Sequence, residues 1–145
     1  MVKKPEPKEK EIERGILQWL NMQPGILAWK IQNTGIPDPR TGKLRTNNSP
    51  FSMKGMADIQ AIWCGLHISI EVKRPSRRSV LSDLQKKYLE DIHNMGGVSF
   101  VATSIEEVQK HLKELQTSTK GKLLWILFNR PSFELENLLK LYEKS

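Results

Sequence analysis

Hydrophobic positions in the first fifty residues follow a helical period, then a strand period, and then become sparse. The helical period predicts a helix from Pro7 to Met22, with an apolar face formed by Ile12, Ile16, Leu17 and Leu20. Gln23-Pro24-Gly25 interrupts this pattern, and the alternation from Ile26 to Asn33 predicts a strand with Leu27, Trp29 and Ile31 on one side. The polar stretch from Thr34 to Lys54 predicts a long loop, and such loops are often functional.

Two apolar segments in the middle of the chain predict a β-hairpin. Its strands span about Ala57 to Trp63 and Leu66 to Lys73, and they are separated by a turn around Cys64-Gly65. If Gly65 and Leu66 are the two turn residues, Lys73 lies opposite Asp58 and Glu71 is a diagonal neighbour of Asp58.

The next segment predicts two capped helices on either side of a strand. Ser82-Asp83-Leu84-Gln85 is a capping-box pattern that opens a helix, whose expected inner face consists of Leu84, Tyr88, Leu89, Ile92 and Met95. Gly96-Gly97 ends this helix, and Val98 to Thr103 is rich in strand-forming residues. Ser104-Ile105-Glu106-Glu107 is a second capping-box pattern, and the helix after it runs to about Leu115 with Ile105, Val108 and Leu112 inward. The predicted order is therefore αβββαβα.

The C-terminal part is set apart by composition. A polar linker from Gln116 to Lys122 precedes an apolar run, Leu123 to Phe128, that predicts a further strand, and Phe133 to Glu143 predicts a further helix. We therefore divide the chain into a flexible N-terminus over residues 1–10, a single domain over 11–115, and an extension over 116–145.

Composition narrows the class of protein. The 145 residues carry a net charge of +7, with a pI near 9.6, and residues 1–55 hold ten basic against five acidic side chains. Such a surface favours polyanionic partners. Cys64 is the only cysteine, which excludes an intramolecular disulfide and a site of clustered thiolates. No apolar run approaches the roughly 18 residues of a membrane span, so we expect a soluble cytoplasmic protein without a membrane partner.

Three charged residues flank the otherwise apolar hairpin. Glu71 and Lys73 lie two positions apart and share one face of their strand, and Asp58 enters the strand beside them. Two carboxylates in this arrangement can hold Mg²⁺, and the Lys73 ammonium can orient water or stabilise negative charge at a phosphate. The competing interpretation is a surface hairpin with an Asp–Lys pair and a nearby glutamate.

The same residues resemble the virus-type replication-repair nuclease (VRR-NUC) domain of the PD-(D/E)xK nuclease superfamily. The resemblance covers about Glu9 to Leu115 and therefore the whole of the domain assigned to residues 11–115. It rests on Glu11-Ile12-Glu13, Lys54-Gly55-Met56-Ala57-Asp58, Ile70-Glu71-Val72-Lys73-Arg74-Pro75, and Leu81-Ser82-Asp83-Leu84-Gln85 followed by Tyr88-Leu89.

The resemblance implies a restriction-endonuclease-like αβββαβ core with a mixed central sheet flanked by helices. It further implies that Asp58 and Glu71 bind the metal, that Val72 lends its carbonyl, that Lys73 is catalytic, and that Glu11 lies near the metal. Gln85 matches a glutamine that approaches the site in the family, although a capping role would explain it equally well. Ala57 stands where the family commonly has proline, which bears on strand entry and not on the chemistry.

The function implied is a Mg²⁺-dependent DNA endonuclease, with Mn²⁺ able to substitute. Small stand-alone members of this family resemble phage-encoded homodimers that act on branched DNA, so we expect Holliday junction resolution inside a bacterial or phage-infected cell. The alternatives are a nick, flap or restriction-like endonuclease and a basic DNA-binding protein without activity. The residues expected to contact the phosphate backbone are Arg40, Lys43, Arg45, Lys54, Arg74, Arg77 and Arg78. The alternative is that these residues are solvated on a surface loop and turn.

Overall fold

The computed structural model describes residues 5–32, 36–45, 49–129, 140 and 143, except for the side chains of residues 36 and 45. Along the chain the elements are α1 (Glu9–Met22), β1 (Ile26–Lys30), β2 (Ile36–Pro37), β3 (Leu44–Arg45), β4 (Ile59–Trp63), β5 (Leu66–Val72), a 3₁₀ turn η1 (Pro75–Arg77), α2 (Asp83–Asn94), β6 (Val98–Ala102), α3 (Ile105–Thr117) and α4 (Thr119–Asn129).

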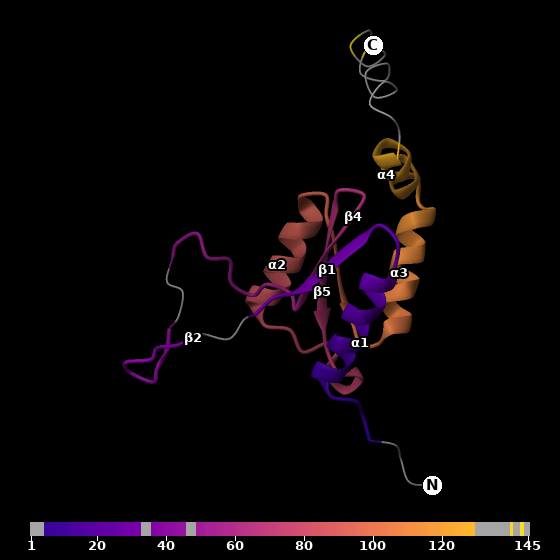
Figure 1. Ribbon diagram of the computed structural model, residues 1–145. Helices are drawn as coiled ribbons and strands as arrows, with labels where there is room; N and C mark the ends of the chain where they lie inside the picture. Colours follow the sequence, from indigo (N-terminus) through magenta and orange to yellow (C-terminus); the bar gives the residue numbers. More distant parts are fainter. Residues whose placement is uncertain (1–4, 33–35, 46–48, 130–139, 141–142, 144–145) are drawn as a thin grey trace.

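A four-stranded mixed sheet in the order β1-β4-β5-β6 forms the centre of the molecule. The pairs β1–β4 and β4–β5 are antiparallel, whereas β5 and β6 are parallel because α2 crosses between them. Helices α1 and α3 cover one face and α2 lies on the other (Figure 1). The predicted α/β class and the order of its core elements are confirmed.

The core lies between the sheet and the pair α1 and α3. Ile16 and Leu20 of α1 are fully buried against alternate residues of β5, among them Ile68 and Ile70, and Val108 of α3 closes the layer. Burial of an aliphatic side chain of this size stabilises a fold by about 1.5–3 kcal/mol. This side of β5 therefore holds the strand firmly, while its other side carries Ser69 and Glu71.

The turn of the central hairpin corrects the predicted register. Cys64 and Gly65 are the two turn residues, with φ of 49° and 76°, and Trp63 pairs with Leu66. Two successive residues at positive φ are the requirement of a type I′ turn. The ladder ends with Ile59 opposite Ile70, so its next step sets Asp58 opposite Glu71 and not opposite Lys73.

Several large apolar residues of β1 and α2 are exposed. In β1 the buried residue is Ala28, while Leu27 and Trp29, which share one side of the strand as predicted, are 63% and 38% exposed. In α2 only Tyr88 is buried, and Leu84 and Met95 at the two ends of the helix are 52% and 87% exposed. Helix α2 packs on β6 and leaves the outer face of β1 open. The predicted inner face of α2 was therefore too wide.

The segment from residue 34 to residue 54 contains a small hairpin, β2–β3, that the sequence did not predict. Asp38 accepts hydrogen bonds from Arg40 N–H at its side chain and from Gly42 N–H at its carbonyl, and its own N–H donates to Lys43 O. Gly42 adopts φ of 64°, which closes the turn. The hairpin stands away from the sheet (Figure 1).

The apolar run from Leu123 to Phe128 is helical, so the predicted strand is wrong. Ser118 starts α4, because its hydroxyl accepts a hydrogen bond from Gly121 N–H and its carbonyl accepts one from Lys122 N–H. The predicted helix from Phe133 to Glu143 lies outside the described residues, apart from Lys140 and Glu143. None of the helices in the described ranges is long and apolar enough to cross a bilayer.

The N-terminal segment is partly fixed to the body of the protein. The Glu6 carboxylate accepts hydrogen bonds from the backbone N–H and the hydroxyl of Ser76, at 2.7 and 2.8 Å, and α1 already begins at Glu9. Residues 1–4, part of the N-terminus expected to be flexible, lie outside the described ranges, and the flexibility of residues 1–10 stays a prediction.

Candidate active site

Asp58 and Glu71 meet at the end of the hairpin opposite its turn. Asp58 Oδ2 accepts a hydrogen bond of 2.9 Å from the backbone N–H of Val72, which joins the two strands directly beyond their ladder. The Val72 side chain is buried in the core. Anchoring at Val72 therefore fixes both the adjacent Glu71 and the rotamer of Asp58.

Glu71 is the most deeply buried charged residue described, at 1% exposure. Its Oε1 accepts from Lys73 Nζ at 2.8 Å and from Gln85 Nε2 at 2.5 Å, whereas its Oε2 has no hydrogen-bond partner among the described residues. A buried carboxylate oxygen without a partner is costly. Lys73 and Gln85 thus hold one oxygen in place, while the other is buried with no hydrogen-bond partner among the described residues.

Burial raises the pKa of both carboxyl groups. For Glu71, loss of hydration is the main cause, opposed by the Lys73 ammonium and supported by the Asp58 charge, and together they raise its pKa. Burial likewise raises the pKa of Asp58, against the Val72 N–H bond and with help from the Glu13 charge. Two carboxylates that disfavour ionisation side by side are the setting in which a bound cation gains most.

Gln85 both caps α2 and contacts Glu71. Its side-chain oxygen accepts from Ser82 N–H at 2.9 Å and Ser82 Oγ accepts from Gln85 N–H, which completes the capping box of α2. Its side-chain nitrogen donates to Glu71 Oε1. The capped first turn of α2 therefore aims this amide at the carboxylate.

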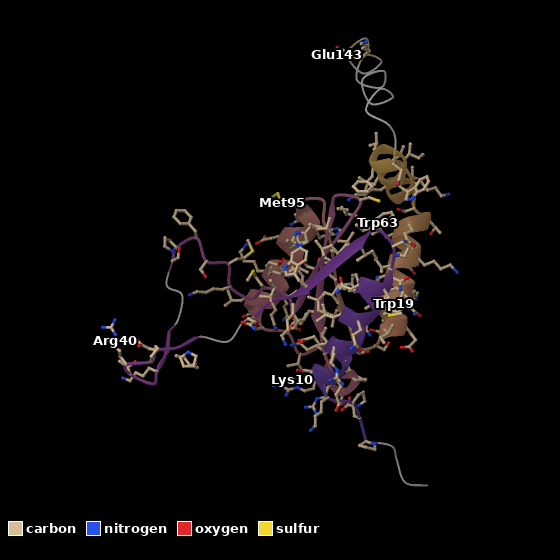
Figure 2. The ribbon with its side chains drawn as sticks, viewed as in Figure 1. Lys10, Trp19, Arg40, Trp63, Met95 and Glu143 are labelled. Atoms are coloured by element: carbon tan, nitrogen blue, oxygen red, sulfur yellow. The ribbon has the colours of Figure 1, made fainter. Side chains whose placement is uncertain are left out.

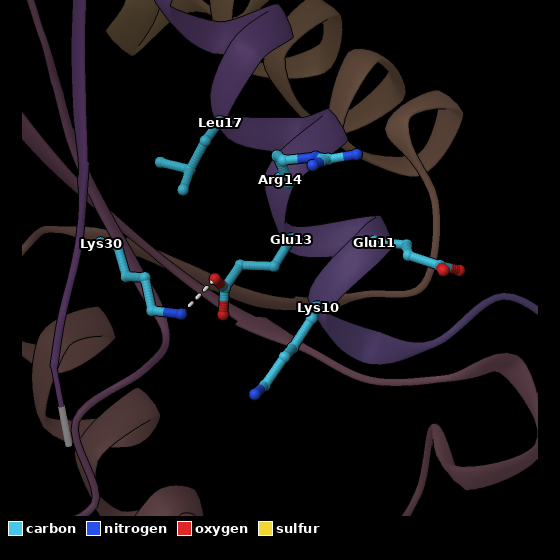
Figure 3. A pocket seen from close by; sticks show the side chains of 6 residues that line it. All are labelled: Lys10, Glu11, Glu13, Arg14, Leu17 and Lys30. Carbon is cyan, nitrogen blue, oxygen red and sulfur yellow. Dashed lines mark hydrogen bonds and ion pairs between the residues drawn. The ribbon is translucent and has the colours of Figure 1, made fainter. Parts of the chain in front are cut away.

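The structure does not bring Glu11, the glutamate of α1 predicted to lie near the metal, to the two carboxylates. Glu11 is exposed, and its carboxylate accepts from Lys8 N–H at 3.0 Å as part of the helix cap. The α1 charges that act on Asp58 are those of Glu13 and Glu9. Figure 3 shows Glu13 reaching towards Lys30, at 2.5 Å, while Glu11 points away. The helix phase thus turns Glu9 and Glu13, one turn apart, towards the hairpin.

The donors present fit one hard cation only in part. Within the described ranges, no group of three or more His, Cys, Asp or Glu side chains is close enough to enclose a metal ion. Asp58 and Glu71 nevertheless place two carboxylates side by side, with Glu71 Oε2 buried and unpartnered. Mg²⁺ commonly uses one or two carboxylates and completes its shell with water and substrate oxygens. This set therefore fits Mg²⁺ better than a metal that needs an all-protein cage.

Gly55 seats the approach to Asp58 against α2. It adopts φ of 71°, and a Cβ at this position would lie 2.5 Å from the backbone carbonyl of Leu84. Only glycine combines that conformation with so close an approach. The segment entering β4 is thereby held against the helical turn that carries Gln85.

Gly55→Ala is expected to lower the free energy of unfolding by about 2 kcal/mol or more, since it adds a backbone clash to the cost of positive φ. Gly25→Ala is the matched control, because Gly25 has φ of 76° and an added Cβ would meet nothing within 4 Å. It should lose only about 1 kcal/mol. Urea unfolding measures both, and equal losses would show that the contact between Gly55 and α2 contributes nothing.

A buried polar network beside the site was not predicted. Gln60 Oε1 is contacted by Ser69 Oγ, Tyr88 OH and His67 Nε2, and Gln60 Nε2 donates to Ala57 O at 3.0 Å. The network ties the residue before Asp58 to α2. Its only sequence signal was the pair of polar residues, Gln60 and Ser69, inside otherwise apolar strands.

The basic residues predicted to bind DNA fall into two groups. Arg40 and Lys43 are exposed on the projecting hairpin, where Figure 2 labels Arg40, and Lys54 is exposed on the segment leading to Asp58. The Arg45 side chain lies outside the described structure. Around η1, Arg74 is half-buried, Arg77 is exposed, and Arg78 forms an ion pair with Glu107.

Glu107 also accepts a hydrogen bond from Thr103 N–H and so does not complete the predicted second capping box.

No family model matches the chain, and neither the curated proteins nor the solved structures gave a match.

Proposed function

We propose that the protein is a Mg²⁺-dependent endodeoxyribonuclease of the VRR-NUC type with a restriction-endonuclease-like core. The observation that carries this proposal is Glu71: a carboxylate at 1% exposure, with one oxygen held by Lys73 and Gln85 and the other unpartnered, beside Asp58. A surface hairpin with an incidental Asp–Lys pair would not bury a carboxylate at this cost. An Asp, a Glu and a Lys from adjoining strand ends match the chemistry of phosphodiester hydrolysis.

In this proposal Asp58 and Glu71 hold Mg²⁺, assisted by the Val72 carbonyl and by a glutamate of α1. The ion supplies Lewis-acid polarisation of the scissile phosphate. Lys73 Nζ, 2.8 Å from Glu71 Oε1, is placed to donate to a phosphate oxygen or to the attacking water as negative charge develops. Gln85 keeps Glu71 oriented. Because the capping box of α2 already holds the Gln85 side chain, little conformational entropy is lost when Gln85 orients Glu71 for binding of the metal ion.

Lys54 and the basic residues of the β2–β3 hairpin and of the η1 turn would supply contacts to the DNA backbone. Their affinity should be largely independent of sequence and should weaken steeply with salt. We further propose a homodimer that acts on branched DNA, with α4 at its interface. In support, the exposed fractions of Leu123, Trp125 and Phe128 are 55%, 56% and 63%, and exposed apolar side chains on one helix are a feature of interfaces between subunits.

The proposal predicts paired symmetric nicks in a four-way DNA junction, and little cleavage of a linear duplex of matched sequence. Cleavage should require Mg²⁺ or Mn²⁺ and stop in EDTA. Denaturing gels with each strand labelled in turn measure this directly. Binding of the junction without cleavage in either metal would identify a non-catalytic DNA-binding protein, and preferential cutting of flaps or nicked duplex would replace junctions as the substrate class.

A further inference from the structure

The most exposed large apolar side chain of the described structure, Phe51, lies on the segment that leads to the candidate site. Phe51 is 95% exposed and Met53, on the same segment, is 59% exposed. Isolated exposed apolar residues are common on proteins. Here two of them lie seven and five residues before Asp58, on the segment that enters β4, so that both precede the candidate site on one continuous stretch of chain.

Hydrogen bonds give this segment a defined backbone. Ser49 accepts from Ser52 N–H at its carbonyl, at 3.0 Å, and from Phe51 N–H at its hydroxyl, at 3.3 Å. At the other end Gly55 is seated on the backbone of Leu84 and Gln85. Phe51 therefore lies on a turn four residues before Gly55, which contacts the helical turn that carries Gln85.

The charge around the segment identifies the kind of partner. Between Asp38 and Asp58 the chain has four basic residues, Arg40, Lys43, Arg45 and Lys54, and no acidic one. Lys54 is exposed next to Met53. A protein that binds an apolar loop does not require every charged residue next to the loop to be positive. DNA does fit this arrangement, because its phosphates attract the cations and its bases can stack on the aromatic ring.

We propose that Phe51, assisted by Met53, inserts between bases where paired strands separate, and so selects branched or unpaired DNA for the nuclease site. This inference rests on the proposed function. Unstacking neighbouring bases in an intact duplex costs free energy, whereas the bases at a branch point are already separated. An aromatic ring that inserts between bases therefore favours branched over linear DNA. Lys54 and the β2–β3 hairpin hold the flanking phosphates while the ring occupies the gap.

The test uses a four-way junction with 2-aminopurine at the branch point, in EDTA so that no cleavage occurs, and a matched linear duplex. Binding of the wild type should raise the 2-aminopurine fluorescence. Phe51→Ala should abolish this rise and weaken junction binding about tenfold, with duplex binding changed less than about twofold. Phe51→Trp should keep both properties. Met95→Ala is the control, because Met95 is 87% exposed at the far end of α2 (Figure 2).

Three results would overturn the inference: unchanged fluorescence and affinity in Phe51→Ala, equal losses for junction and duplex, or a shift in oligomeric state in light scattering, which would assign Phe51 to a protein contact. The outcomes are separable from those of the proposed function. If Mg²⁺-dependent cleavage is unaffected by Phe51→Ala, the proposed nuclease activity stands and the insertion of Phe51 between bases is rejected. If the fluorescence rise depends on Phe51 but no cleavage occurs in Mg²⁺ or Mn²⁺, the insertion of Phe51 between bases stands and the proposed nuclease activity is rejected.

Discussion

Lys73→Ala and Glu71→Gln are each expected to lower the rate of Mg²⁺-dependent DNA cleavage by about a thousandfold. Lys73 supplies the positive charge closest to Glu71, at 2.8 Å, and its loss removes a group that acts as charge develops on the phosphate. Glu71→Gln keeps the shape of the side chain and can still accept a hydrogen bond from Gln85, but it removes the negative charge that would hold the proposed cation. Single-turnover cleavage with enzyme in excess measures the chemical step directly.

Lys87→Ala is the matched control for Lys73. Lys87 is an exposed lysine on α2 that pairs with Asp91, away from the carboxylates, and its removal should leave the rate within about twofold. Junction affinity in EDTA should change little in Glu71→Gln, since that carboxylate is buried. A Lys73→Ala enzyme with nearly normal turnover would show that the ammonium only neutralises Glu71 in the free protein.

The three central residues could be predicted because strand alternation is a strong rule. Glu71 and Lys73 had to share a face whatever the turn, and the buried Val72 between them had to face the core. The register was harder. A Cys-Gly pair is an uncommon type I′ turn, because Cys64 must adopt a positive φ that residues other than Gly, Asn and Asp seldom adopt. The observed register differs from the predicted one by two residues. This difference leaves each side chain on the same face of the strand but makes Glu71, and not Lys73, the residue opposite Asp58.

The position of Glu11 in α1 and the wrong strand prediction at α4 both depend on how a helix starts. The capping interaction at Lys8 uses Glu11, so the glutamate that best suited the family pattern was already engaged by the helix itself. At α4 a continuous apolar run has no periodicity to separate strand from helix, and the deciding feature was the Ser118 cap. The Gln60 network escaped prediction because hydrogen bonds between distant elements leave no periodic signal.

In the absence of metal, the contribution of Asp58 and Glu71 to the stability of the protein is expected to fall as the pH rises above their ordinary pKa values. Their folded-state pKa values lie above the ordinary values of 3.8 and 4.5. The stabilising contribution of each group is therefore fully present below its ordinary pKa and is lost as the pH rises through the raised one. Glu6 and Glu107, whose pKa values are lowered, act in the opposite direction, so the comparison must be between variants.

Glu71→Gln isolates this effect. In EDTA the variant should gain stability relative to the wild type as the pH rises, because an amide has no charge to desolvate. Mg²⁺ should stabilise the wild type by about 2.7 kcal/mol at a hundredfold excess over its Kd, less at pH 4.5, where protons compete for the carboxylates, and hardly at all in the variant. Urea unfolding as a function of pH measures both terms. An equal Mg²⁺ effect on the two proteins would place the cation elsewhere, whereas a lost effect would link the burial of Glu71 to the binding of a metal ion.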